Sequence, residues 1–341
     1  MSSISNSYKN KSWHLVSRPT REQLAGPQNF TLVEGEMAEP AEGQVLIRHL
    51  FLSLDPYMRG RMNDGKSYAA PQNLNETMVG GTVGEIVASR HPKFREGDRV
   101  VGMGGWQLYA LSDGTGLRKL PANDSIPVEA YIGPAGMPGI TAWVGTTQII
   151  KPKAGETYVV SAATGAVGTV AGQLAKMAGA RVVGIAGGAD KCRYAVETLG
   201  LDACVDHRAA DFERQLAGAT PDGIDGLFEN VGGDPFKFAL RRINFHSRIA
   251  LCGLVASGYD GTPTTLEDMR MVLNARCLIQ GFIVTDYLPL WPQAISELSG
   301  QLASGRIKWR TSVAEGIEGA PEAFFSMLKG GNFGKQLVRL T

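Results

Sequence analysis

Cysteines, excess charge and long apolar runs are all scarce in this sequence, and each scarcity excludes a class of protein. The four cysteines lie far apart and form no C-x-x-C pair, which argues against a disulfide framework and against a structural zinc clip. Lys and Arg number 34 against 33 Asp and Glu, with no basic block, so no nucleic-acid partner is expected. No apolar run approaches the length that spans a bilayer, and residues 1–17 lack the apolar core of a signal peptide. We therefore expect a cytoplasmic protein without a membrane partner.

The length of 341 residues predicts two domains, because one hydrophobic core rarely serves so long a chain. Short β-like runs separated by glycines predict a β-rich domain over residues 1–130. Over residues 131–305, apolar strands alternate with helical segments, a pattern typical of a doubly wound parallel α/β sheet. Residues 306–341 are expected to form a helix and a short strand that fold back on the first domain.

The strongest motif is an apolar strand that runs into a glycine turn and then into an amphipathic helix, over residues 158–178. Gly165 lets the backbone approach a pyrophosphate, and Gly168 lets the helix pack closely on its strand. The first N–H groups of the helix are then free to bind an anion. Ala163 takes the place of the first glycine of a G-x-G-x-x-G motif. A turn without a ligand is the alternative, but a second strand follows at the spacing of a dinucleotide-binding unit.

The end of the second strand indicates which dinucleotide binds. NAD enzymes place an acidic residue there to bind the ribose 2′-hydroxyl, whereas this strand ends in Ile185-Ala186-Gly187-Gly188. Asp190 is expected to start the next helix. Lys191 is well placed to meet a 2′-phosphate, unless it is an ordinary surface lysine. The sequence therefore predicts NADPH as the cofactor.

Five blocks of sequence, in order along the chain, together carry a resemblance to a known family. They are D-P-Y-M-R at 55–59, G-M-P-G-I-T-A at 136–142, A-A-T-G-A-V-G at 162–168, F-E-N-V-G-G at 228–233 and G-N-F-G-K at 331–335. The chain resembles the prostaglandin reductase, or alkenal/one oxidoreductase, family of zinc-independent medium-chain dehydrogenases/reductases, over nearly its whole length past Lys11. The resemblance implies a Rossmann-type domain, a GroES-like barrel domain and the NADPH-dependent reduction of the C=C bond of an α,β-unsaturated ketone or aldehyde.

The family resemblance also implies roles for individual residues. Gly165, Ala166, Val167 and Gly168 would hold the pyrophosphate, and Lys191 the 2′-phosphate. The rest of the cofactor groove would be lined by Asn230, Cys252, Gly253, Phe282, Ile283, Val284 and Asn332. Tyr259, and after it Tyr57, would reach the substrate and donate a hydrogen bond to its carbonyl oxygen, with the ribose hydroxyl of the cofactor as a third donor.

Several of these roles have simpler alternatives. Tyr57 is otherwise an aromatic that packs the barrel, and Asn332 a turn residue in the left-handed conformation. Relatives carry a tyrosine at the 2′-phosphate where this chain has His207, which weakens the claim to that contact. The segment 252–259 is one residue longer than usual, so the position of Tyr259 is open, and a solvent-facing loop tyrosine is its alternative.

A metal centre is not expected, although zinc alcohol dehydrogenases share this architecture. Their catalytic zinc needs Cys and His ligands from the first domain, but no cysteine precedes Cys192. Residues 79–84 read V-G-G-T-V-G, without the ligating histidine and its acidic neighbour. His14, His49 and His91 are scattered, without partners at ligand spacing.

Two other functions share much of this pattern: an NADPH-dependent quinone reductase of the zeta-crystallin type, and an NADPH-binding protein without turnover. The D-P-Y-M-R block favours the enone reductase over the quinone reductase. A homodimer is expected as well, because the apolar stretch from Leu278 to Val284 predicts a long edge strand, and such edges are usually paired or covered.

Overall fold

The structure is a computed structural model that describes residues 8–341 except 21, 123–124, 257–264 and 266–268. Tyr259 therefore lies outside the described residues. The chain divides into two compact units. The β-rich unit is Met1–Ile132, Ser312–Asn332 and Gln336–Thr341, and the α/β unit is Gly133–Thr311 and Phe333–Lys335.

The α/β unit is built on a six-stranded parallel sheet with the order β11-β10-β9-β12-β13-β14. Its strands are β9 (Thr157–Ser161), β10 (Arg181–Ala186), β11 (Ala203–Asp206), β12 (Ile224–Glu229), β13 (Ile243–Leu251) and β14 (Leu278–Gly281). The chain starts in the middle at β9, proceeds outward through β11, and then returns to the other side of β9 with β12. This order is that of the doubly wound Rossmann fold, so the predicted fold class is confirmed.

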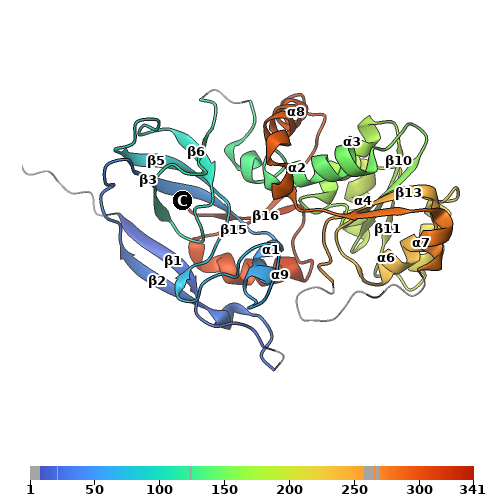
Figure 1. Cartoon of the computed structure of the whole chain (residues 1–341), viewed down its shortest axis with the longest axis horizontal. Coiled ribbons are helices and arrows are strands. Elements are labelled where there is room, and N and C mark those ends of the chain that lie inside the picture. The colour runs from blue at the N-terminus through green and yellow to red at the C-terminus, as the bar shows by residue number, and fades with distance from the viewer. Residues whose placement is uncertain (1–7, 21, 123–124, 257–264, 266–268) are drawn as a thin grey trace, which may run out of the picture. The chain divides into compact units, whose positions relative to one another are not determined.

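Helices cover both faces of this sheet, which explains why its strands are apolar throughout (Figure 1). In β9, Tyr158 and Val160 belong to one core, whereas Val159 between them belongs to the other. The first core contains residues of α2 (Met137–Val144), α3 (Gly168–Met177), α4 (Ala189–Glu197) and α8 (Trp291–Ala303). The second contains residues of α5 (Phe212–Ala219) and α6 (Gly233–Leu240), with Met271 of α7 (Arg270–Ala275) packed against it.

The β-rich unit contains a seven-stranded and a three-stranded sheet. The larger has the order β15-β16-β3-β5-β6-β8, with β7 also paired to β3, and the smaller has the order β2-β1-β4. The strands are β1 (Lys9–Leu15), β2 (Phe30–Glu36), β3 (Val45–Ser53), β4 (Glu76–Thr77), β5 (Thr82–Ser89), β6 (Arg99–Gly102), β7 (Tyr109–Ser112), β8 (Arg118–Lys119), β15 (Thr311–Glu315) and β16 (Lys335–Arg339). Two helices, α1 (Tyr57–Arg61) and α9 (Ala320–Leu328), join its core around Trp106 and Phe324.

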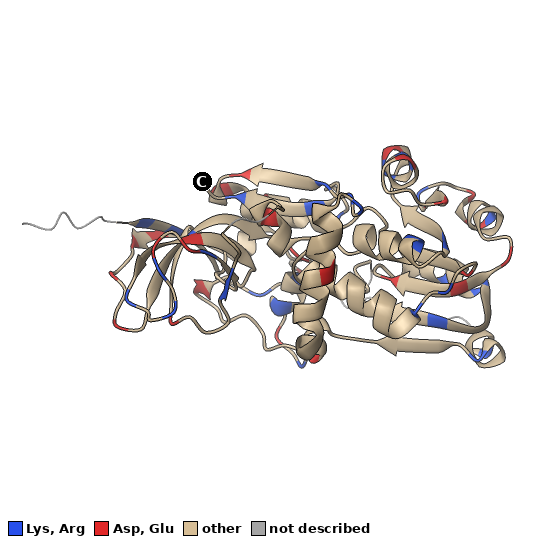
Figure 2. Cartoon of the chain, turned by 90° about the horizontal axis from the view of Figure 1, so that it is seen from above, with Lys and Arg blue, Asp and Glu red and all other residues tan. Residues whose placement is uncertain are grey.

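The charges of the molecule are mixed in sign, as its composition predicts. Figure 2 shows Lys and Arg interspersed with Asp and Glu along both units. Among the helices of the described residues, none combines the length and the apolar character needed to cross a bilayer.

The predicted edge strand from Leu278 to Val284 is shorter than expected, because β14 ends at Gly281. Its neighbour β13 ends at Leu251, which pairs with Gly281. The residues after Gly281 therefore have no strand residues opposite them with which to pair. The side chain of Phe282 instead lies in the core, where its ring packs edge-on against the ring of Phe228 with 6.3 Å between the two ring centroids. A 3-10 helix follows at Val284–Leu290.

His49 in β3 makes the stability of the β-rich unit sensitive to acid. Its Nδ1 donates to the carbonyl oxygen of Gln107 at 2.9 Å, and its buried Nε2 has no partner among the described residues. Burial lowers the pKa of His49 to about 4, although the Gln107 carbonyl acts in the opposite direction. The unfolded chain takes up this proton near its ordinary pKa of 6.5, so stability is present above pH 6.5 and is lost as the pH falls toward 4.

We expect His49 to contribute a loss of roughly 3 kcal/mol in the free energy of unfolding between pH 7 and pH 4. Denaturant unfolding at a series of pH values measures it, with the variant His49→Gln losing less stability over this range than the wild type. His91→Gln is the control, because it removes another histidine of the same unit, one that is only partly buried. Parallel pH profiles for the wild type and His49→Gln would contradict the assignment.

Candidate active site

The turn after β9 has the geometry of an anion-binding turn. A Cβ at Gly168 would lie 2.2 Å from the carbonyl oxygen of Ala162, so only glycine lets α3 begin this close to its strand. Among the described residues, no acceptor is found for the backbone N–H groups of Val167 and Gly168, whereas Gly165 N donates to Ala162 O and Thr169 N to Gly165 O. N–H groups without an acceptor at a helix N-terminus are of the kind that binds a phosphate group in other proteins.

Most of the predicted cofactor residues follow the carboxyl ends of the strands of the parallel sheet. Asn230 follows β12, Cys252 and Gly253 follow β13, and Phe282, Ile283 and Val284 follow β14. Cys252 N and Gly253 N both donate to the carbonyl oxygen of Glu229, at 2.8 and 3.1 Å. Successive strands are added on one side of β9 up to β11 and on its other side from β12 onward. Ligands of doubly wound sheets bind at the carboxyl ends of the strands where this reversal of strand order occurs.

A buried network at this point was not predicted from the sequence. Oε1 of Glu229 accepts hydrogen bonds from Ser161 Oγ at 2.8 Å and from the backbone N–H groups of Val231 at 2.6 Å and Gly232 at 2.7 Å. The amide of Asn230 donates to Ser161 O at 2.8 Å. Burial raises the pKa of Glu229, and the N–H donors oppose that shift. The network fixes the ends of β9 and β12 against each other, and the only sequence signal for it is an acidic residue inside an apolar strand.

Positive charge and aromatic rings gather beside the end of β10. Lys191 lies in the first turn of α4, and its Nζ is 6.0 Å from the ring centroid of Phe333. The guanidinium carbon of Arg310 lies 3.9 Å from the same centroid, and the ring of Tyr194 meets Phe333 edge-on at 5.1 Å. As predicted, Asp190 is in the first turn of α4, where it pairs with Arg193. Sequence reasoning missed Arg310 and the ring of Phe333 at this corner because they come from distant segments, and it missed Tyr194 although that residue lies in α4 itself.

His207 and Arg208 belong to the same corner. A Cβ at Gly187 would lie 2.9 Å from His207 Nε2 and 3.1 Å from Arg208 Nε, so both side chains lie against the glycine that follows β10. Burial, helped by the positive charges of Arg208 and Lys191, lowers the pKa of His207. At neutral pH His207 is therefore uncharged, and Arg208 is a stronger partner for a phosphate than the histidine named from the sequence.

The G-N-F-G-K block at 331–335 contacts the turn after β9. Gly334 forms a parallel β-bridge with Gly165, and Lys335 N donates to the carbonyl oxygen of Arg310 at 3.0 Å. Gly334 has a φ of +84°, and a Cβ there would lie 2.1 Å from the Arg310 carbonyl oxygen. Asn332, just before it, is half-buried, and its predicted contact with the cofactor stays a prediction.

Tyr57 is the first residue of α1 in the β-rich unit, where it packs against the core around Trp106. Its side chain is partly buried, and burial with the nearby Asp55 carboxylate raises the pKa of its phenol. The Asp55 carboxylate in turn accepts a short hydrogen bond from Ser53 Oγ. The phenol is therefore protonated across the physiological pH range, as a hydrogen-bond donor has to be.

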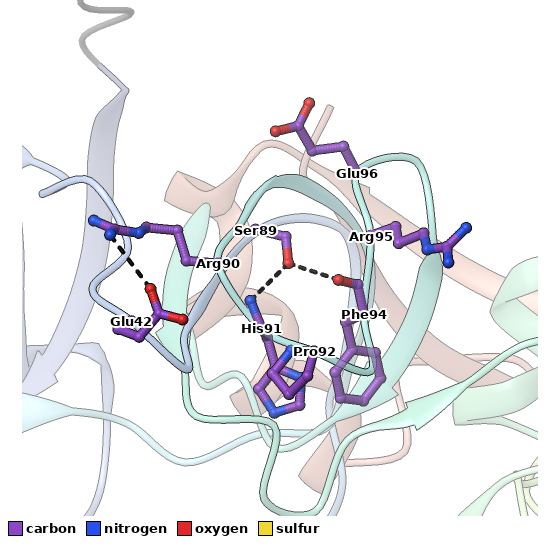
Figure 3. Close-up of a pocket in the computed structure, with 8 residues that line it drawn as sticks. All are labelled: Glu42, Ser89, Arg90, His91, Pro92, Phe94, Arg95 and Glu96. Carbon is purple, nitrogen blue, oxygen red and sulfur yellow. Dashed lines mark hydrogen bonds and ion pairs between the residues drawn. The ribbon is translucent and has the colours of Figure 1, made fainter.

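A surface hollow in the β-rich unit does not include any of the predicted site residues. It is lined by Glu42, Ser89, Arg90, His91, Pro92, Phe94, Arg95 and Glu96. Figure 3 shows the interactions among its lining residues: Arg90 pairs with Glu42 at 3.3 Å, and Ser89 Oγ donates to Phe94 O and accepts from His91 N.

Possible metal ligands are dispersed through the chain. Across the part that the structure describes, no three residues of the types His, Cys, Asp and Glu lie together as ligands for an ion.

Comparison with known proteins relates these features to a family. A family model described as the N-terminal domain of oxidoreductase matches residues 11–120, and one described as zinc-binding dehydrogenase matches residues 166–300. The chain is 46% identical to NADPH-dependent curcumin reductase of Escherichia coli (strain K12), with 97% of each chain covered. It is 37% identical to prostaglandin reductase 1 of Rattus norvegicus, over 91% of this chain and 94% of that protein.

A solved structure gives the same result for the fold. The crystal structure of CurA from Vibrio vulnificus in complex with NADPH matches with a TM-score of 0.91 and 43% identity, over 97% of this chain and 99% of that one. With 97% of this chain covered, the agreement includes both units. The chain therefore belongs to the prostaglandin reductase, or alkenal/one oxidoreductase, family of the medium-chain dehydrogenases/reductases.

Proposed function

We propose that this protein is an NADPH-dependent reductase of the C=C double bond of α,β-unsaturated ketones and aldehydes. The observation that carries the proposal is the 46% identity, over 97% of both chains, to a protein named NADPH-dependent curcumin reductase. Backbone N–H groups of Val167 and Gly168, which have no acceptor among the described residues, suit a pyrophosphate, and Lys191, Arg208 and Arg310 suit a 2′-phosphate. No acidic residue ends β10, so nothing there favours a ribose 2′-hydroxyl over the phosphate.

The proposed chemistry assigns the chain three tasks. NADPH, when bound, supplies the hydride for the β-carbon of the substrate. The turn after β9 would hold the pyrophosphate that joins the two halves of the cofactor, and the corner around Lys191 would hold its 2′-phosphate. Reduction places negative charge on the substrate's carbonyl oxygen as an enolate, and a protonated phenol stabilises that charge by donating a hydrogen bond. Tyr259 and Tyr57 are the two phenols proposed for this role.

Steady-state consumption of NADPH tests the function, in the presence of a chelator and with three conditions: an enone, a quinone and no acceptor. We expect rapid oxidation with the enone and formation of the saturated ketone, identified by mass spectrometry of the product. Faster turnover of the quinone would make the protein a quinone reductase, and binding of NADPH without turnover would make it a non-catalytic binding protein. A panel of curcuminoid, alkenal and prostanoid-like enones then ranks the substrates.

Lys191→Ala is expected to raise KM for NADPH about tenfold while leaving KM for NADH unchanged, because a charge-assisted contact to the 2′-phosphate contributes roughly 1.4 kcal/mol. The wild type should accordingly prefer NADPH by at least about tenfold in kcat/KM. Arg193→Ala is the matched control, since it removes a positive charge from the same helix where that charge pairs with Asp190. Equal kcat/KM for the two cofactors in the wild type would show that Lys191 has no such role.

We also propose a homodimer formed through the β14 edge of the parallel sheet. The edge strand begins with Leu278, of which 51% is exposed, and the neighbouring α7 and β13 expose Leu273 at 73% and Phe245 at 70%. Apolar side chains beside an unpaired strand edge favour pairing with a second copy. Analytical ultracentrifugation should show a dimer at micromolar concentration, and Leu273→Asp should weaken it, whereas a monomer under these conditions would overturn the proposal.

A further inference from the structure

An acidic residue, Glu229, lies at the point of the parallel sheet where the strand order reverses. The last pair in the ladder between β9 and β12 is Val160 with Phe228, and Ser161 and Glu229 are the next residues of the two strands. Both of these polar residues are buried. Because a buried carboxylate is costly unless hydrogen bonds compensate it, an apolar residue would suit the strand better, and the acid has to serve something beyond the strand.

The carboxylate holds the turn after β12 from within. Glu229 Oε1 accepts hydrogen bonds from the backbone N–H groups of Val231 at 2.6 Å and Gly232 at 2.7 Å, and Gly232, with a φ of +77°, is the N-cap of α6. The N–H groups that lead into α6 therefore bind an anion of the chain itself. Those of Val167 and Gly168 at the start of α3 have no acceptor among the described residues. A phosphate group is thus directed to α3 and not to α6.

Ser161 connects this turn to the end of β9. Its Oγ donates to Glu229 Oε1 and accepts from the backbone N–H of Asn230, each at 2.8 Å. The side-chain amide of Asn230 donates to Ser161 O, also at 2.8 Å. Asn230 is thereby held through both its backbone and its side chain, which gives the side chain a fixed orientation relative to β9.

The segment after β13 is attached to the same residues. The backbone N–H groups of Cys252 and Gly253 both donate to Glu229 O. A Cβ at Gly253 would lie 3.2 Å from the carbonyl oxygen of Asn230, so the turns after β12 and β13 are in close contact. A shift of Glu229 therefore moves both turns, and both contain residues predicted to line the cofactor groove.

We propose that Glu229 and Ser161 are positioning residues for NADPH, which hold the turns after β12 and β13 in the conformation that receives the nicotinamide half of the cofactor. A doubly wound sheet binds one half of a dinucleotide on each side of the reversal of strand order. The turn after β9 and the corner around Lys191 take the pyrophosphate and the 2′-phosphate, which leaves the nicotinamide half to the side of β12, β13 and β14. Both residues act through the two turns and not by contact with the cofactor. The inference rests on the proposed function, whose cofactor it takes as given.

Titration of the whole protein with NADPH, followed by fluorescence, tests the positioning role. We expect Ser161→Ala to raise Kd about five- to tenfold through the loss of one buried hydrogen-bonding group. Glu229→Met has a similar length but no acceptor, and its Kd should rise more than about thirtyfold. Glu229→Gln keeps an oxygen acceptor in the same place, so its Kd should stay within about threefold of the wild-type value. Recovery by glutamine but not by methionine separates hydrogen bonding from the filling of space.

Tyr158→Phe is the matched control for Ser161→Ala. Tyr158 is buried near the start of the same strand, where its hydroxyl forms one hydrogen bond, with Thr146 Oγ1 at 2.9 Å. Loss of this bond should lower the midpoint of thermal unfolding, as Ser161→Ala does, and leave the Kd for NADPH unchanged. An equal rise in Kd for Tyr158→Phe would overturn the proposal, because any weakening of β9 would then disturb the cofactor site.

Hydrogen exchange of the protein without NADPH provides a measurement that does not depend on the cofactor. The amides of Val231 and Gly232 should exchange at least about tenfold faster in Glu229→Met than in Glu229→Gln, because only glutamine leaves them an acceptor. Wild-type protein that does not bind NADPH would refute the proposed function. If the wild type binds NADPH and Ser161→Ala, the milder variant, binds it equally well, the positioning role alone is overturned.

Discussion

Replacing Tyr57 or Tyr259 with phenylalanine is expected to lower kcat for enone reduction about a hundredfold while KM for NADPH changes little. Each variant removes one hydroxyl, and loss of a single donor to a developing oxyanion typically costs this much. Burial and Asp55 raise the pKa of Tyr57, so its rate contribution should persist into alkaline solution. Steady-state kinetics of both variants at saturating NADPH measures the effect.

The comparison of the two variants decides which phenol acts. Tyr109→Phe is the control, because Tyr109 lies in β7 of the β-rich unit and its ring contacts Tyr8 at 5.4 Å. If Tyr57→Phe loses activity and Tyr259→Phe keeps it, Tyr57 is the donor and the longer segment before Tyr259 has moved that side chain out of reach. Normal kcat in both variants would refute the tyrosine mechanism and leave the charge to the ribose hydroxyl or to water.

A single methyl group at Gly334 is expected to damage both stability and cofactor binding. The Cβ of Gly334→Ala would lie 2.1 Å from the rigid carbonyl oxygen of Arg310, at a φ of +84°. We expect a loss of about 2 to 4 kcal/mol in the free energy of unfolding. Because Gly334 bridges to Gly165, the turn after β9 should shift as well, and KM for NADPH should rise more than about tenfold.

Gly300→Ala provides a matched control for that experiment. Gly300 lies within α8, and a Cβ there would have nothing within 4 Å. Alanine at this position should leave KM unchanged and stabilise the protein by up to about 1 kcal/mol, since alanine favours helix over glycine. Thermal unfolding and NADPH kinetics of both variants measure these effects, and a Gly334→Ala protein with normal KM would show that the bridge does not support the turn.

Local patterns were enough to predict the architecture of the α/β unit. The apolar runs alternate with helices at regular spacing, and the strand, turn and helix around Gly165 and Gly168 follow one another within about 20 residues of chain. The position of Asp190 at the start of α4 followed from helix-capping preferences in the same way. Each of these features depends on neighbours in sequence, so one sequence carries the information.

Contacts between distant segments were not predictable in this way. Arg310 and Phe333 meet beside Lys191 only because the chain returns to the α/β unit after α9. The predicted end of β14 at Val284 was wrong. The length of the neighbouring strand β13, and not the apolar run itself, decides where the pairing between the two strands stops. The roles of Tyr57, Asn332 and His207 depend on the bound cofactor and substrate, and they remain predictions.

The bridge between Gly165 and Gly334 has a consequence for protein synthesis. The glycine turn after β9 leaves the ribosome long before residues 333–335, although these residues complete the α/β unit. Domains usually fold as they emerge, so the Rossmann sheet can assemble on the nascent chain while the turn proposed to bind phosphate still lacks the Gly334 bridge and Lys191 still lacks the Phe333 ring. A fragment that ends at residue 311 should therefore fold its sheet but bind NADPH poorly, because the proposed cofactor site would be completed only by a segment made near the end of translation.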